Sequence, residues 1–177
     1  MKLAECLTRI GLNSDDFIKS YAVVSVDDDN QKVVVDVELP VIKFDAVSDY
    51  HRSCKGYKQK YKSNDALFVD DDNKLYFIEF KSGHPDSADL RVKSSESLLV
   101  AMDMGLIENL QDSQKNVEYF LVTSDNALER LHSLAGKGHA TWGGIGSQNW
   151  LYKAVHAYTP REFKKWFLQK YYPDYQM

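Results

Sequence analysis

Hydrophobic and polar positions follow a helical period at the start of the chain and a strand period soon after. Apolar residues recur every three or four positions over residues 2–11, and Gly11 ends the run, which predicts a short amphipathic helix. Valine-rich runs at 21–26 and 31–39 flank an acidic turn and predict a β-hairpin. A further strand is predicted over residues 41–47.

The stretch from Asn64 to Lys81, NDALFVDDDNKLYFIEFK, contains two apolar runs joined by an acidic turn and predicts a second hairpin. Beyond it, helices alternate with strands. In order, the predicted elements are a helix over 87–104 closed by Gly105, a strand over 116–124, a helix from Asp125 or Asn126, a glycine-rich loop over 136–150, a strand over 150–158 and a helix that begins at Thr159. Together these elements predict one domain over residues 1–177, an α/β (α+β) sandwich in which helices flank a central mixed β-sheet.

Composition and charge narrow the classes of function. The net charge of −4 argues against a protein that coats nucleic acid with its whole surface, but it leaves room for a local basic track. Cys6 and Cys54 lack metal-ligand spacing, so we expect two buried thiols in a reducing cytoplasm, with one disulfide as the alternative. Charged residues interrupt the first twelve positions and no run of about 18 apolar residues occurs, so we expect neither a signal peptide nor a membrane span.

The most basic stretch of the chain is YHRSCKGYKQKYK, residues 50–62. Its tyrosines, Tyr50, Tyr57 and Tyr61, are interleaved with cations, a composition that suits phosphate contacts and stacking on unpaired bases. A solvated lysine-rich loop is the alternative. The candidate nucleic-acid-binding residues are Arg52, Lys55, Lys58, Lys60 and Lys62.

Three charged residues stand at the open end of the second hairpin. Asp65 opens its first strand, while Glu79 and Lys81 close its second. Side chains two apart on a strand share a face, and both faces of this strand are apolar up to Ile78. Charges next to such an apolar layer must be paired, bind a metal or reach a cleft.

The length of the hairpin loop decides whether Asp65 joins Glu79. A loop of two or four residues would place Asp65 opposite Ile78, with its carboxylate on the other face. A three-residue loop, 71–73, would place it opposite Glu79, with the Cβ atoms about 5 Å apart. Asn73 suits the left-handed position that ends such loops, so we predict the three-residue loop. Two carboxylates at that spacing suit a shared Mg²⁺ or Mn²⁺.

Asp65, followed after thirteen residues by Glu79-Phe80-Lys81, resembles the D-x(n)-E-x-K form of the PD-(D/E)xK nuclease superfamily. Asn64 stands where the superfamily has its name-giving proline. The resemblance covers about residues 1–124 and implies a restriction-endonuclease-like αβββαβ core. It also implies that Asp65, Glu79 and the carbonyl of Phe80 bind Mg²⁺ or Mn²⁺, and that Lys81 orients or activates the attacking water.

The resemblance implies further residues as well. The helix after the lysine usually supplies an auxiliary polar residue, for which Lys93 and Ser97 are the candidates. Some members add an acidic residue from the first helix, which in this chain would be Glu5.

The function expected first is therefore a metal-dependent nuclease that cleaves phosphodiester bonds of DNA or RNA. The alternative is a catalytically inactive nuclease-like binding module, such as an immunity or antidote protein or an accessory subunit. The acidic net charge favours that alternative, because acidic surfaces suit basic protein partners. A third reading is a plain scaffold domain with no site, in which Lys81 forms an ordinary ion pair with Glu79 or Asp65 at the rim of a sheet. A homodimer is left open.

Overall fold

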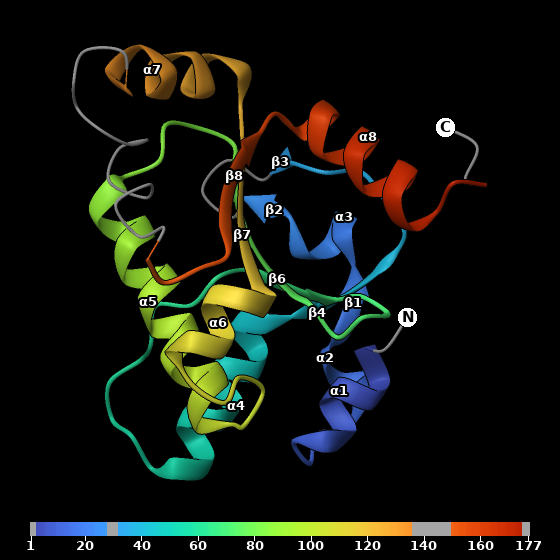
Figure 1. Cartoon of the computed structure of the whole chain (residues 1–177), viewed down its shortest axis with the longest axis vertical. Coiled ribbons are helices and arrows are strands. Elements are labelled where there is room, and N and C mark those ends of the chain that lie inside the picture. The colour runs from blue at the N-terminus through green and yellow to red at the C-terminus, as the bar shows by residue number, and fades with distance from the viewer. Residues whose placement is uncertain (1–2, 28–31, 136–149, 175–177) are drawn as a thin grey trace.

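The computed structural model describes residues 3–27, 32–135 and 150–174. Its centre is a mixed six-stranded sheet in the order β1-β4-β5-β6-β7-β8 (Figure 1). The strands of this sheet are β1 Ile18–Ser20, β4 Pro40–Lys43, β5 Ala66–Val69, β6 Leu75–Lys81, β7 Val117–Thr123 and β8 Ala154–Tyr158. Pairing is antiparallel from β1 to β6 and parallel from β6 to β8. The predicted α/β architecture with a mixed sheet is thereby confirmed.

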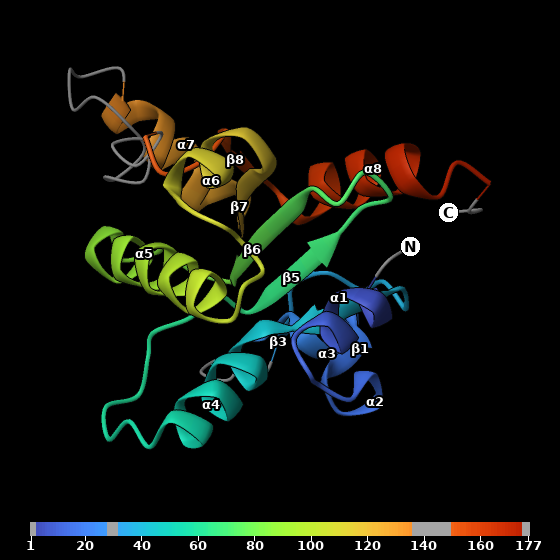
Figure 2. The same cartoon turned by 60° about the horizontal axis from the view of Figure 1, so that its bottom comes forward.

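Helices cover both faces of the sheet. Their bounds are α1 Leu3–Arg9, α2 Ser14–Phe17, α3 Tyr21–Val24, α4 Phe44–Lys55, α5 Ser87–Asp103, α6 Leu110–Asn116, α7 Asp125–Ala135 and α8 Pro160–Tyr171. Helices α4 and α5 lie on one side of the sheet and α8 on the other (Figures 1 and 2). A separate two-stranded ladder pairs β2 Val26–Asp27 with β3 Lys32–Val33.

Strand β6 is the buried axis of the sheet. Its residues from Leu75 to Phe80 are all buried, as the doubly apolar pattern predicts. On one face the ring of Phe77 packs edge-on against Phe44 of α4, with centroids 4.9 Å apart. On the other face Phe80 packs against Phe163 of α8 at 6.2 Å. Any charge near the end of this strand is therefore held between two apolar layers.

The turn between β5 and β6 has the predicted three-residue loop. Ala66 pairs with Ile78 and Val69 with Leu75, so the same register places Asp65 opposite Glu79. Asn73 adopts a left-handed conformation with φ of 60°. The carboxylate of Asp70 holds the turn together: it accepts hydrogen bonds from the backbone N–H groups of residues 72 and 74, at 3.0 and 2.9 Å, and from the hydroxyl of Tyr76 at 2.8 Å.

The prediction of the first hairpin is wrong over most of its length. Residues 21–24 form helix α3, which Ser20 caps by accepting a hydrogen bond from the backbone of Val23. Of the described residues 32–39, only 32 and 33 are in a strand. The rest bonds to α3 and its end: Ser25 Oγ both accepts from and donates to the backbone of Val35, at 2.9 and 3.2 Å. These local polar contacts override the β preference of valine.

Other boundaries also differ from prediction. The strand expected over residues 41–47 ends at Lys43, and α4 follows as far as Lys55. Gly56 adopts φ of 70° and is the C-cap that ends this helix. Helix α6 was not predicted. The predicted loop 136–150 lies outside the described residues except for Trp150, and so do residues 28–31 of the first turn.

The remaining predictions agree with the structure more closely. Helix α5 occupies the predicted range, and α8 begins with the predicted capping box, in which Thr159 and Glu162 bond each other's backbone. Both cysteines are free, but Cys54 is exposed, which corrects the expectation of two buried thiols. Among the residues described, no helix combines the length and the apolar character needed to cross a membrane.

We expect Asn73→Ala to lower the free energy of unfolding by about 1 kcal/mol, because alanine disfavours the left-handed conformation. Asn73→Gly should leave it within about 0.5 kcal/mol, since glycine adopts that conformation freely. Urea unfolding monitored by circular dichroism measures both. Asp72→Ala, in the same turn, is the control, because it removes only an exposed ion pair with Lys74. Equal unfolding midpoints for Asn73→Ala and wild type would contradict this account of the turn.

Candidate functional site

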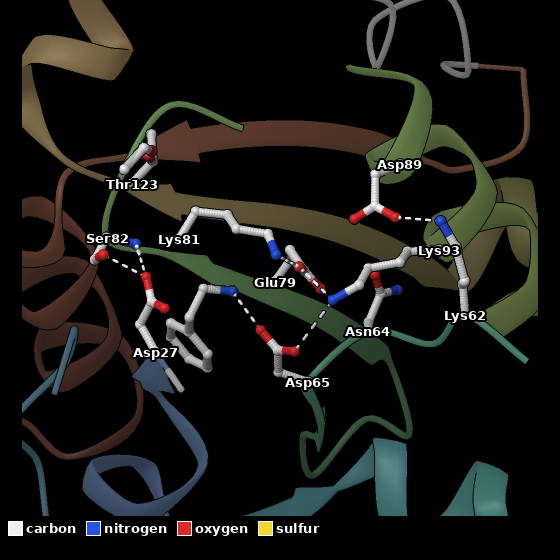
Figure 3. A network of polar contacts seen from close by, with 12 residues as sticks. Asp27, Lys62, Asn64, Asp65, Glu79, Lys81, Ser82, Asp89, Lys93 and Thr123 are labelled. Carbon is white, nitrogen blue, oxygen red and sulfur yellow. Dashed lines mark hydrogen bonds and ion pairs between the residues drawn. The ribbon is translucent and has the colours of Figure 1, made fainter. Parts of the chain in front are cut away.

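Four charged side chains converge at the end of β6 (Figure 3). Asp65 directly precedes β5, Glu79 and Lys81 belong to β6, and Lys93 belongs to α5. Lys93 Nζ lies 2.7 Å from Glu79 Oε1 and 3.5 Å from Asp65 Oδ1. Lys81 Nζ lies 3.1 Å from the same Glu79 oxygen. The structure thus brings the three predicted catalytic residues together with the auxiliary candidate Lys93.

The main chain fixes the carboxylate of Asp65 in this position. Its Oδ2 accepts a hydrogen bond of 2.8 Å from the backbone N–H of Phe80. The backbone carbonyl of Asp65 accepts one of 3.0 Å from the backbone N–H of Phe44. Burial raises the pKa of Asp65, while Lys93 acts in the opposite direction. The orientation of this carboxylate is therefore fixed by a backbone hydrogen bond that the register of the hairpin makes possible.

Glu79 is the most buried charge of the site, with an exposed fraction of zero. Burial, reinforced by repulsion from Asp65, raises its pKa to about 7, although Lys93 and Lys81 oppose the shift. Burial alone would lower the pKa of Lys93, but Glu79 and Asp65 outweigh it and raise that pKa. Glu79 Oε2 has no hydrogen-bond partner in the described part of the chain. One oxygen of Glu79 thus contacts both ammonium groups, and the other has no partner among the described residues.

Asn64 is a site residue that the sequence did not single out for its side chain. It is fully buried, and Figure 3 shows it beside Lys93 and Glu79. Both polar atoms of its amide lack a hydrogen-bond partner within the described ranges. The backbone N–H of Asn64 donates to Ser97 Oγ at 2.8 Å, so Ser97 supports the segment before Asp65. Among the described residues, Ser97 makes no hydrogen bond to the carboxylates. The position of Asn64 directly before Asp65 is the signal in the sequence that could have identified it as a site residue.

Glu5 does not belong to this cluster. It lies on α1 and lines a small cavity of about 120 Å³ at the turn end of the hairpin, together with Cys6, Arg9, Val69, Asn73 and Leu75. Val69 lies four residue steps along the strand from Asp65, which corresponds to about 13 Å. The expectation that Glu5 adds an acidic group to the site is therefore corrected.

Most of the candidate nucleic-acid-binding cations are paired within the protein. The ion pairs are Arg52 with Asp49 at 3.7 Å, Lys60 with Asp49 at 3.0 Å, Lys55 with Asp103 at 3.1 Å and Lys62 with Asp89 at 2.8 Å. Lys58 has no ion pair among the described residues. The basic stretch is thus largely neutralised by carboxylates from α4 and α5. Only the pair Arg52–Asp49, three residues apart on α4, follows from sequence spacing, and the lysine pairs do not.

A cleft of about 450 Å³ opens beside the charged cluster. It is lined by Asp27, Lys62, Lys81, Gly83, His84, Pro85, Asp86, Ala88, Asp89 and Val92. Asp27 enters from β2 and accepts hydrogen bonds from the backbone and the hydroxyl of Ser82. Lys81 both contacts buried Glu79 and lines the cleft, so it connects the carboxylates with the surface where a substrate can enter.

The donor set fits a hard divalent cation. Oxygens of Asp65 and Glu79 already converge on one positive charge, the ammonium of Lys93, and Glu79 Oε2 has no hydrogen-bond partner among the described residues. The N–H of Phe80 faces Asp65, and in a strand the C=O of a residue faces the same side as its N–H. Within the described ranges no group of three or more His, Cys, Asp or Glu side chains is placed to hold a metal. A cation would therefore need the two carboxylates, the Phe80 carbonyl and water.

Comparison of the chain with models of protein families, with curated proteins and with solved structures gave no match.

We expect Lys93→Met to lower the free energy of unfolding by about 3 kcal/mol at pH 7.5, because it leaves the buried Glu79 with less compensation. Adding Glu79→Gln to it should recover much of that loss. Urea unfolding of both single variants and the double variant gives the coupling energy. Lys74→Met, at an exposed ion pair, is the matched control and should cost less than about 1 kcal/mol. An additive double variant would show that Lys93 and Glu79 do not act as a pair.

Proposed function

We propose that the protein is a divalent-metal-dependent nuclease that hydrolyses phosphodiester bonds of DNA or RNA. The observation that carries the proposal is the register of β5 and β6, which sets Asp65 and Glu79 on one face beside Lys81. The element order supports it as well. Apart from the elements α2 to β3, the helix α4 between β4 and β5 and the helix α6 before β7, helix α1 precedes the antiparallel strands β4, β5 and β6, which are followed by α5 and by β7 parallel to β6. This order is compatible with the restriction-endonuclease-like core that the resemblance implies.

Each residue has a role that follows from its surroundings. Asp65, Glu79 and the carbonyl of Phe80 would hold Mg²⁺ or Mn²⁺. When bound, such an ion lowers the pKa of a water and offsets negative charge on the phosphate. Lys81 lines the cleft and reaches Glu79, so its ammonium is placed to orient a water between the carboxylate and a substrate phosphate.

The charge balance of the site is consistent with this assignment. The carboxylates of Asp65 and Glu79 are balanced by Lys81 and Lys93, so the cluster carries about zero net charge. A divalent cation would make it positive, which favours a phosphodiester in the adjacent cleft. Since Lys93 Nζ contacts Asp65 Oδ1 and Glu79 Oε1, a cation bound by those oxygens would compete with this ammonium, whereas Glu79 Oε2 has no hydrogen-bond partner among the described residues. Lys93 thus serves as the auxiliary residue that keeps the site neutral in the absence of metal.

The contact of Lys93 with both carboxylates also favours a second candidate function, the inactive binding module. With Lys93 already between them, the carboxylates are compensated without any metal. The basic stretch 50–62 is largely paired with acidic residues, and the chain carries a net charge of −4. An acidic surface suits a basic protein partner.

We expect labelled DNA or RNA to be cleaved with Mg²⁺ or Mn²⁺ and to remain intact in EDTA, with activity restored when metal is added back. Glu79→Gln and Lys81→Met should each reduce the rate by a factor of about 10² or more. Gel electrophoresis of end-labelled substrates measures cleavage, and circular dichroism verifies folding. Glu5→Gln is the matched control, because Glu5 lies at the other end of the hairpin.

Calorimetry separates the two candidate functions. The nuclease requires Mn²⁺ binding that Glu79→Gln abolishes, and the absence of heat of binding in wild type would exclude it. The binding module requires a stable complex with a basic protein that persists in EDTA and in Glu79→Gln, with no cleavage of any nucleic acid.

A further inference from the structure

A second cleft lies between the end of α4 and α5. It measures about 470 Å³ and is lined by Gly56, Tyr57, Lys58, Gln59, Lys60, Tyr61 and Glu96. These residues, except Glu96, belong to the connection from α4 to β5 (Figure 2). We refer to this cleft as the tyrosine groove. The proposed nuclease chemistry at Glu79 assigns it no role.

The tyrosines of the groove are held in place by ring contacts with each other and with His51. The rings of Tyr57 and Tyr61 meet edge to face, with centroids 6.1 Å apart, and both lie within 6.4 Å of the ring of His51. His51 is buried and contacts Asp103 at 2.7 Å. Despite this support, 47 % of Tyr57 is exposed. A large aromatic surface is therefore presented to solvent in a fixed orientation.

The backbone of the groove is anchored as well. Tyr57 donates its N–H to the carbonyl of Arg52 at 3.1 Å, and Arg52 Nη1 donates to the carbonyl of Tyr57 at 3.2 Å. The left-handed Gly56 makes the sharp exit from α4 that permits both bonds. Pre-organisation of this kind lowers the entropy lost when a ligand binds.

Lys62 connects the tyrosine groove with the candidate site. It follows Tyr61 directly, and its backbone N–H donates to Glu96 Oε2 at 2.6 Å, the residue that closes the groove. Its ammonium bonds Asp89 at 2.8 Å and lines the cleft that Lys81 also lines (Figure 3). Residues 56–62 thus run from the tyrosine groove to the cleft that Lys81 lines.

The chemistry of this surface favours single-stranded nucleic acid over a duplex. Exposed aromatic rings stack on unpaired bases, whereas the bases of a duplex are stacked on one another and offer only their edges. Duplex binding depends mainly on free cations that replace counterions at phosphates. Here four of the five candidate cations, namely Arg52, Lys55, Lys60 and Lys62, are already paired with carboxylates.

We propose that the tyrosine groove binds unpaired bases of single-stranded nucleic acid, DNA or RNA, and leads the strand to Lys81. This inference rests on the proposed nuclease function and names the substrate class. Tyr57 supplies the stacking surface, Tyr61 and His51 support it, and Lys58 faces the phosphates.

Fluorescence anisotropy in EDTA measures binding without cleavage. The probes are fluorescein-labelled 15-mers of deoxythymidine and of uridine, and a 15-base-pair duplex. We expect at least one single strand to bind about tenfold more tightly than the duplex. Tyr57→Ala should weaken single-strand binding by about tenfold, as expected for one lost stacking contact. Tyr57→Phe, which keeps the ring, should stay within about twofold of wild type.

Tyr50→Ala is the matched control. Tyr50 is as exposed as Tyr57, at 48 %, but its ring packs on Phe17 of α2, away from the groove. It should leave oligonucleotide affinity unchanged. Equal affinity for duplex and single strands would overturn the proposal, and so would a Tyr57→Ala variant that binds as wild type does. A basic protein that binds in a Tyr57-dependent manner, while no oligonucleotide binds, would overturn it in favour of a protein partner.

The outcomes also separate this inference from the proposed nuclease. Metal-dependent cleavage of duplex DNA at an equal rate by wild type and Tyr57→Ala would retain the nuclease and overturn the groove. Tyr57-dependent binding of single strands with no cleavage under any metal would retain the groove as a binding site and remove the nuclease.

Discussion

The candidate site depends on one constraint, the three-residue turn between β5 and β6. Side chains alternate across a strand, so a slip of one residue in pairing would turn the carboxylate of Asp65 to the opposite face from Glu79. The left-handed Asn73 and the hydrogen bonds to Asp70 fix the pairing from the far end of the hairpin. At the near end, the bond from Phe80 N–H to Asp65 is made in that same register. Residues with no chemical role thus determine where the chemistry can occur.

Placing two carboxylates at the end of a doubly covered strand creates an electrostatic problem that the fold must solve. Glu79 is removed from water entirely, and Asp65 repels it, so both need cations nearby. Lys81 comes from the same strand, but Lys93 comes from a helix that packs over this face. Burial of the strand and the position of α5 are therefore coupled through this ion cluster. Glu79 Oε2 has no hydrogen-bond partner in the part of the chain that the structure describes, so the two lysines do not satisfy the carboxylate completely.

Sequence reasoning succeeded where structure is determined locally and failed where it depends on distant partners. The hairpin register followed from Asn73, and the start of α8 from a capping box, because both signals lie within a few residues. The valine-rich segment 21–39 was misassigned because its hydrogen bonds go to a serine and a helix that the pattern does not reveal. Glu5 was placed in the site by resemblance, which carries no distances. The carboxylates that neutralise the basic stretch lie on α4 and α5, and nothing in sequence spacing pairs them with those lysines.

Helix α5 unites the two clefts in one rigid element. Asp89, Lys93 and Glu96 are spaced four and three residues apart, which places them along one side of a helix. Asp89 holds the ammonium of Lys62 at the first cleft, Lys93 holds the carboxylates of β6, and Glu96 closes the tyrosine groove. A rotation of α5 would therefore disturb all three contacts together. Lys93 contacts both carboxylates, so a cation bound there would change a contact made by the same helix that positions the tyrosine groove. Binding of the two proposed ligands, metal and nucleic acid, would therefore be energetically linked.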